Sequence, residues 1–235
     1  MESDPDLDPE DYTVAWIAPL EVEAQAAWYM LDNEHKGQFT IRRGDDYVYT
    51  AGDINGHNVV IATFPAGHSY GVGSAAALAS QVKKSFPNLW FGLLVGVAAG
   101  LPNLSRFPQR DIRLGDVLVG IGEGDIAGLL SYGLGRQTND GFELLRHGDQ
   151  AKTETVVRSA IGSIKAFAPM RGNGEFLKHY ERIKDKEHST GTFRDPGQDR
   201  DQLYQTVAKE GYVTEQVERM PRDPVSYTHL RASVN

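Results

Sequence analysis

The chain of 235 residues contains no cysteine, so a disulfide framework and a thiolate zinc site are both excluded. It also has no apolar run of the roughly 18–20 residues that a membrane helix requires. No basic segment followed by an apolar one opens the chain, so a secretory leader is not predicted. The 32 acidic residues outnumber the 24 basic ones, and the resulting net charge of −8 argues against a nucleic-acid groove. These absences predict a soluble, cytoplasmic protein that binds neither nucleic acid nor membrane.

A second absence concerns dinucleotide cofactors. The segment Gly71–Ala76 fits G-x-G-x-x-[G/A], which is the fingerprint of a dinucleotide-binding turn. That fingerprint also requires an acidic residue about 20 positions later, which holds the ribose hydroxyls. Residues 77–110 contain neither Asp nor Glu. A nicotinamide- or flavin-dependent oxidoreductase is therefore disfavoured, and no cofactor is predicted.

Along the chain, apolar segments typical of buried strands alternate with segments whose apolar residues recur at helical spacing. Nearly continuous apolar segments separated by helices are typical of a mostly parallel sheet covered on both faces. Strands are expected at 12–20, in a hairpin over 47–64 that turns at Asn55-Gly56, at 93–101 and at 111–122; helices are expected at 21–35, 74–86, 152–168 and 175–185; and a polar loop is expected at 193–205. The predicted fold class is α/β.

Two glycine-rich turns and a carboxylate pair are expected at one edge of this sheet. The first turn is Gly71–Ala76 and the second is Gly96–Gly100, while Glu21 and Glu23 follow the first strand. Ligands of open α/β sheets bind beyond the carboxyl ends of the strands, so these segments predict a crevice for a neutral, hydroxyl-rich ligand such as a ribose. Two structural alternatives remain open: a tight strand-to-helix turn, and glutamates favoured by the helix dipole.

Four segments in this order resemble the nucleoside phosphorylase and nucleosidase superfamily. They read "WIAPLEVEAQAA", "YGVGSAAAL", "VGVAAGL" and "LGDVLVG". The resemblance is closest to a branch found at the N-terminus of large fungal multidomain receptors, in which segments like "FPNLWFGLLVGVAAGLP" and "FRDPGQDRDQLY" occur together. It covers about residues 11–224. It implies a three-layer αβα fold with a mostly parallel or mixed central sheet.

The resemblance also implies a substrate and a reaction, namely a purine-type nucleoside or nucleotide whose N-glycosidic bond is cleaved. Phosphorylases of the family carry an arginine and a hydroxyl residue around the position of Gly96, where this chain has Leu93, Leu94 and Val97. Hydrolysis is therefore favoured, with Glu23 as the catalytic residue. The ligand-binding residues implied by the resemblance are Ala18, Gly71, Gly73, Gly96, Val97 and Ala98.

Two rival functions come from the same resemblance. The first is a non-catalytic nucleoside-binding sensor or effector module of a larger receptor. The second is a phosphorylase with phosphate as co-substrate, which a homo-oligomer would complete across a subunit interface.

The end of the chain departs from the family pattern. The family's later elements, which include the acid that protonates the purine, are expected after residue 225 and do not occur in this sequence. We therefore expect an acidic leader at 1–10, a nucleoside phosphorylase-like domain truncated at its C-terminus over 11–225, and a tail of doubtful origin at 226–235.

Overall fold

The structure is a computed structural model. It describes residues 5–40, 43–67, 71–105, 107, 109–122, 128–129, 135–139, 141–144, 153–171, 174–186, 193–194, 197–209, 211–219 and 231–232. The chain forms two compact units, Met1–Ala99 with Ile183–Thr190, and Gly100–Arg182 with Gly191–Asn235. They are called the first and second unit below, and each is described by itself. The boundaries expected from the sequence, a single domain over 11–225 among them, stay predictions.

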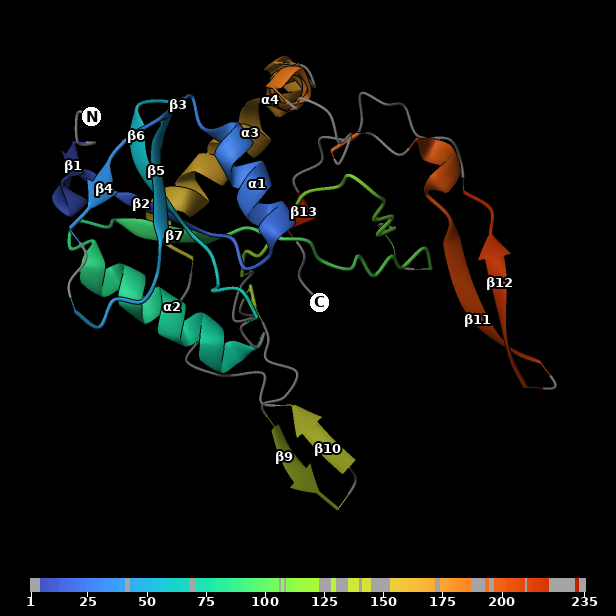
Figure 1. Ribbon diagram of the computed structural model, residues 1–235. Helices are drawn as coiled ribbons and strands as arrows, with labels where there is room; N and C mark the ends of the chain where they lie inside the picture. The colour runs from blue at the N-terminus through green and yellow to red at the C-terminus, as the bar shows by residue number, and fades with distance from the viewer. Residues whose placement is uncertain are drawn as a thin grey trace. The chain divides into compact units, whose positions relative to one another are not determined.

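The first unit is built on a five-stranded mixed sheet in the order β3-β5-β6-β2-β7 (Figure 1). The central strand β2 runs parallel to β6 and β7, while β5 is antiparallel to both β6 and β3. A separate parallel pair joins β1 to β4. The strand bounds are β1 Asp6–Leu7, β2 Val14–Ile17, β3 Asn33–Glu34, β4 Gln38–Phe39, β5 Tyr49–Ile54, β6 His57–Ala62 and β7 Phe91–Leu94, and a 3-10 turn, η1, spans Pro9–Asp11. The α/β prediction is confirmed.

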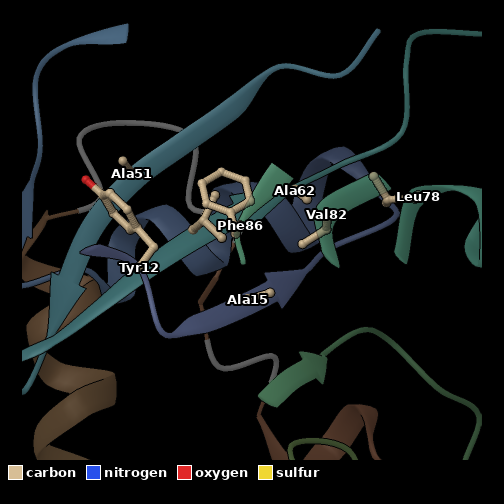
Figure 2. Packing of buried hydrophobic residues seen from close by; sticks show 8 residues of the cluster. Tyr12, Ala15, Ala51, Ala62, Leu78, Val82 and Phe86 are labelled. Carbon is tan, nitrogen blue, oxygen red and sulfur yellow. The ribbon is translucent and has the colours of Figure 1, made fainter. Parts of the chain in front are cut away.

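Helices α1 (Glu21–Met30) and α2 (Val72–Ser85) pack on opposite faces of this sheet. Successive side chains of a strand point to opposite faces, and β6 shows the division directly. Val60 and Ala62 belong to the cluster that contains Leu78, Val82 and Phe86 from α2 and its C-cap (Figure 2). On the other face, Ile61 packs with Ala27 and Leu31 from α1 and its C-cap. The first unit is therefore a three-layer αβα arrangement.

The β5–β6 hairpin forms at the predicted place. Asn55 has φ 52° and Gly56 has φ 80°, which is the left-handed pair that a type I′ turn requires. Asn tolerates this region and Gly adopts it without steric cost. The Asn-Gly turn therefore brings β5 and β6 into register, with Ile54 opposite His57.

The described residues of the second unit form two hairpins, one short parallel pair and most of the remaining helical structure. Its antiparallel hairpins are β9 with β10 and β11 with β12, and β8 pairs in parallel with β13. The bounds in this part of the sequence are β8 Leu118–Val119, β9 Gly135–Thr138, β10 Gly141–Leu144, α3 Thr155–Arg171, α4 Gly174–Lys186, η2 Gln198–Arg200, β11 Leu203–Lys209, β12 Gly211–Val217 and β13 Arg231–Ala232.

Several predictions for this region need correction. The strand expected over 111–122, with an entry turn at Gly115-Asp116, is reduced to the two residues of β8. The turn itself is confirmed, because the Asp116 N–H donates to the Arg113 carbonyl at 3.1 Å and Gly115 has φ 83°. The loop expected over 193–205 ends in β11, so the β11–β12 hairpin was missed. The two helices expected at 152–168 and 175–185 are confirmed as α3 and α4 with shifted ends. Among the helices of the described residues, none is both long and apolar enough to cross a membrane.

Candidate functional site

The carboxyl ends of three parallel strands meet at one edge of the first unit's sheet. Ile17 of β2 lies in register with Ala62 of β6 and with Leu94 of β7. From β2 the chain passes through α1 to the β5–β6 side, whereas β7 lies on the other side of β2. The strand order therefore reverses beside β2, and open α/β sheets bind ligands at such a switch point.

Glu23 links the turns that follow β2 and β7 at this edge. Its Oε2 accepts a hydrogen bond from the Leu20 backbone N–H at 2.9 Å, which is the glutamate half of a helix capping box. Its Oε1 accepts a hydrogen bond from the Val97 backbone N–H at 2.7 Å. Glu23 is only 8% exposed. This bridging carboxylate, called the Glu23 clamp below, fixes two segments that are 74 positions apart in the sequence.

Gly96 is the residue that lets the two turns approach so closely. A Cβ atom built on Gly96 would meet Glu23 Oε1 directly and would lie 2.9 Å from the Glu23 carboxyl carbon. A larger residue would therefore push the carboxylate away from the Val97 N–H. Within this structure, the glycine turn after β7 makes room for a carboxylate of the protein itself.

The other predicted residues of this turn differ in their surroundings. Ala18 is fully buried, and its N–H donates to the Ala62 carbonyl at 2.9 Å, so it extends the β2–β6 ladder. Val97 and Ala98 are exposed, and the Val97 side chain is 77% accessible. Any contact with a ligand would come from the exposed backbone around Val97 and not from the Ala18 side chain.

The first glycine turn caps helix α2 at the same edge. Because β6 ends at Ala62 and α2 returns the chain to the start of β7, the N-terminus of α2 lies at the carboxyl edge of the sheet. Gly71 is the N-cap with φ 146°, a conformation that side-chain-bearing residues rarely adopt. A Cβ on Gly73 would meet nothing within 4 Å. Gly71 is thus required by the backbone, whereas the space around Gly73 is open.

The structure separates the two glutamates that the sequence placed together. Glu21 begins α1 and is exposed, while Glu23 is buried in the clamp. His57 is exposed at the start of β6, which is the opposite, amino edge of the sheet. His68, in the first glycine loop, lies outside the described residues. Among the described residues, Glu23 is the buried carboxylate at the carboxyl edge of the sheet, and Glu21 lies at the same edge but faces solvent.

Sequence reasoning missed a polar chain at the amino edge. The Tyr12 hydroxyl lies 2.8 Å from His35 Nδ1, and His35 Nε2 lies 3.3 Å from Asp53 Oδ2. Asn33 also donates to Asp53, at 3.1 Å. Burial raises the pKa of Tyr12, and the nearby Asp11 charge adds to the effect. These residues carry no shared motif, so no sequence signal pointed to them.

A second missed cluster joins the segment before β5 to the end of α2. Asp45 accepts hydrogen bonds from the Ser85 hydroxyl at 2.6 Å and from the Tyr49 hydroxyl at 3.1 Å. Desolvation opposes ionisation of Asp45, but the hydrogen bonds from Ser85, the Tyr47 backbone, Gln81 and Tyr49 outweigh it and lower the pKa of Asp45. Burial raises the pKa of Tyr49. Among the described residues, no group of three or more metal-ligating side chains comes together.

The chain is 36% identical over 162 residues to a nucleotide-binding leucine-rich repeat (NLR)-like protein of the fungus Hyaloscypha variabilis. The match covers 69% of this chain and 16% of the relative, so this chain corresponds to a small part of a much longer protein. No protein-family model and no solved structure matches the chain. The chain is thus similar to a segment of a fungal NLR-like protein.

Proposed function

We propose that this chain is the nucleoside-binding module of a larger NLR-like receptor, and that its ligand is a purine-type nucleoside or nucleotide. The observation that carries the proposal is the Glu23 clamp, which ties the half-buried turn after β2 to the exposed turn after β7 at the switch point of the sheet. The similarity to part of an NLR-like protein supports the receptor context. The motifs shared with the nucleoside phosphorylase superfamily support the class of ligand.

The clamp has hydrogen-bonding capacity that a ribose can use. Each carboxylate oxygen has two lone pairs, and the clamp uses one bond from a backbone N–H on each. A ribose hydroxyl donating to Glu23 would add a charge-assisted hydrogen bond next to the exposed Gly96–Ala98 backbone. Cleavage of the bound nucleoside is not required for this role.

Hydrolysis of the N-glycosidic bond is the second candidate function. It is favoured over phosphorolysis because Leu93, Leu94 and Val97 offer neither the arginine nor the hydroxyl group that a local phosphate site would use. In this reaction the ribose–base bond breaks, the oxygen of water bonds to the anomeric carbon, and the two protons of water end on the base and the sugar. Glu23 would hold that water through a free lone pair, on the face of the ribose opposite the base.

Two measurements on the purified chain separate these functions. Binding is measured by titration calorimetry with adenosine, guanosine, inosine and their monophosphates, and release of free base is followed with and without phosphate. The test variant is Glu23→Gln, which presents an amide N–H to one of the two backbone donors and so disrupts the clamp. The matched control is Glu21→Gln on the exposed first position of α1.

The outcomes are distinct. A receptor module binds at least one of these ligands without turnover, and Glu23→Gln weakens binding about tenfold or more while Glu21→Gln does not. If the unmodified chain releases free base without phosphate and Glu23→Gln does not, the chain is a hydrolase that depends on Glu23. A chain with native circular dichroism that binds none of the ligands refutes both functions.

A further inference from the structure

The turn between β5 and β6 lies at the amino edge of the first unit's sheet, opposite the Glu23 clamp. Its two residues, Asn55 and Gly56, are both exposed. Within the described part of the chain, neither the Asn55 carboxamide nor the Gly56 N–H has a hydrogen-bond partner. A Cβ atom built on Gly56 would meet nothing within 4 Å. The Asn55 carboxamide and the next backbone nitrogen are therefore adjacent, unbonded and unshielded.

These two groups are the reactants of asparagine deamidation, the reaction that makes asparagine a thermolabile residue. The Gly56 nitrogen gives its proton to solvent and attacks Cγ of Asn55. A bond forms between that nitrogen and Cγ, the bond from Cγ to Nδ2 breaks, and Nδ2 leaves as ammonia. The product is a five-membered succinimide. Water then opens this ring at one of its two carbonyls, which gives aspartate or isoaspartate, so water is the only further reactant.

Two contacts hold the turn in place, and both leave the reacting groups free. Ring closure requires rotation about the Cα–C bond of Asn55, which has φ 52°. The ladder ends at the pair of Ile54 and His57, and Asp32 Oδ2 accepts the Asn55 N–H at 2.6 Å. Neither contact involves the Gly56 nitrogen or the Asn55 carboxamide. Since glycine is the residue with the fewest steric restrictions, the rotation is confined to the exposed turn.

Asp32 opposes the reaction in two ways. Its hydrogen bond fixes the backbone of Asn55 and so restricts the rotation. Its negative charge beside the turn also disfavours loss of the proton from the Gly56 nitrogen, because that loss creates a second negative charge nearby. The Asp32 side chain is exposed, so solvent screens its charge and the effect is moderate. Asp32 is thus the described side chain through which the fold slows this reaction.

We propose that Asn55 is a site of spontaneous deamidation in the folded protein, that Asp32 slows the reaction, and that isoaspartate at this position breaks the Ile54–His57 pair. In isoaspartate the main chain runs through the former side chain, which adds one carbon to a two-residue turn. Loop length fixes the register of a hairpin, so the ladder pair next to the turn is lost. Val59 and Val60 are buried in the sheet and hold the rest of the hairpin.

Mass spectrometry of the full chain, incubated folded at mildly alkaline pH, tests the site. Trypsin releases residues 44–83 as one peptide, so Asn55 and Asn58 are measured together. A parallel sample in urea gives the rate of the unfolded chain. Because exposed turns open at almost no free-energy cost, folded Asn55 should convert within about tenfold of its unfolded rate. Asn58, whose side chain donates to the Asp11 carbonyl at 3.0 Å, should stay intact. Isoaspartyl methyltransferase identifies the isoaspartate product.

Two variants and one exchange measurement test the roles of Asp32 and of the product. Asp32→Asn should speed deamidation of Asn55 about threefold, whereas Glu21→Gln, the same charge change at the carboxyl edge, should not alter it. Circular dichroism checks that both variants fold. In the purified isoaspartate form, hydrogen exchange at the His57 N–H should be at least tenfold faster. Protection of folded Asn55 by more than about a hundredfold, equal rates in Asp32→Asn and the unmodified chain, or unchanged exchange at His57 would each overturn the proposal.

Discussion

Different forces hold the sheet of the first unit and the β11–β12 hairpin of the second in place. Strand β6 is buried on both faces between α1 and α2, and Val60 and Ala62 have no accessible surface. The side chains of residues 204–206 and 213–216 in the hairpin are exposed, and the largely buried contacts at its base are ionic. A strand buried on both faces is fixed by apolar area, whereas an exposed hairpin depends on a few polar contacts at its ends.

The largest effect is expected where the apolar force is concentrated. Phe86 is 1% exposed, and its ring packs edge-on against Tyr12, Phe39 and Tyr49. Phe86→Ala removes this packing and leaves a cavity, so it should lower the free energy of unfolding by about 3–5 kcal/mol. Denaturant unfolding followed by tryptophan fluorescence measures this, because Trp16, Trp28 and Trp90, the chain's three tryptophans, all lie in the first unit.

The control for this substitution is a truncation of an exposed apolar side chain in the same unit. Val48 is 79% exposed, so Val48→Ala should leave the fluorescence midpoint within about 0.5 kcal/mol of the unmodified chain. Equal losses from both substitutions would contradict a core centred on Phe86.

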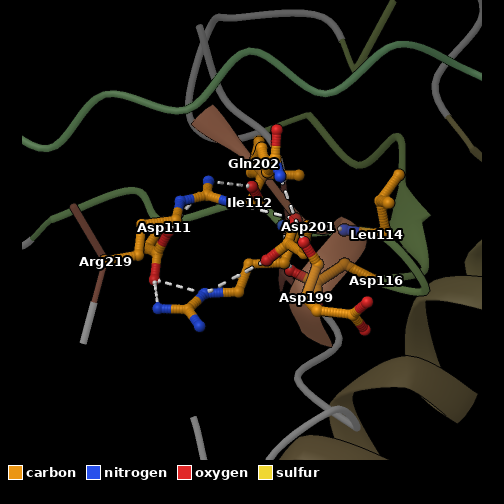
Figure 3. A network of polar contacts seen from close by, with 9 residues as sticks. Asp111, Ile112, Leu114, Asp116, Asp199, Asp201, Gln202 and Arg219 are labelled. Atoms are coloured by element: carbon orange, nitrogen blue, oxygen red, sulfur yellow. Dashed lines mark hydrogen bonds and ion pairs between the residues drawn. The ribbon is translucent and has the colours of Figure 1, made fainter. Parts of the chain in front are cut away.

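A smaller effect, located in the second unit, is expected from breaking the ion-pair cluster formed by Asp111, Arg113, Asp201 and Arg219 (Figure 3). Arg219→Ala removes one of the two cations that Asp111 and Asp201 share and leaves Arg113 to neutralise both. The loss of this largely buried partner should cost about 2–4 kcal/mol, because part of each charge still reaches water. Hydrogen exchange should accelerate at least tenfold over residues 203–217. The tryptophan transition of the first unit should not move.

An exposed ion pair in the second unit provides the contrast for this experiment. Arg136 and Glu143 face each other across β9–β10 at 2.8 Å, but their side chains are 69% and 58% exposed. Arg136→Ala should cost no more than about 1 kcal/mol and should lose its effect in high salt. If Arg136→Ala and Arg219→Ala lower the free energy of unfolding by the same amount, burial does not set the strength of the ion pairs of Arg219.

Sequence reasoning succeeded where a local pattern determines the structure. The Asn55-Gly56 turn, both helices that cover the sheet and the α/β class followed from turn chemistry and apolar periodicity. The same reasoning failed for the β11–β12 hairpin. It classed residues 193–205 as loop because they are polar, while one contact that anchors the hairpin base joins Arg219 to Ile112, 107 positions away in the sequence.

The candidate site divides in the same way. The glycine turns and Glu23 were identified from their positions after predicted strands, because strand ends define an edge of the sheet. The residues alone do not distinguish Glu21 from Glu23, since both are acceptable in the first turn of a helix, and the choice of Glu23 came from the family resemblance. The Val97 N–H that decides the matter belongs to another strand's turn. A hydrogen bond across 74 residues leaves no local signature in the sequence.

The smallest change adds a single methyl group at Gly96. It tests whether the hydrogen bonds of Glu23 are as rigid as the buried sheet or can adjust, as exposed polar contacts do. Gly96→Ala places a Cβ against the Glu23 carboxylate, so the side chain must shift and lose the Val97 N–H, at a cost of about 1–3 kcal/mol. Gly73→Ala is matched to it, because its Cβ enters open space in the first turn of α2 and should be neutral or stabilise by up to about 1 kcal/mol. Tryptophan-monitored unfolding measures the free energy of unfolding of both variants.

If Gly96→Ala proves as harmless as Gly73→Ala, the Glu23 carboxylate has room to move, and the contact between the two turns can adjust when a ligand binds. A loss confined to Gly96→Ala makes the clamp part of the rigid frame, so that a ligand would meet a preorganised carboxylate.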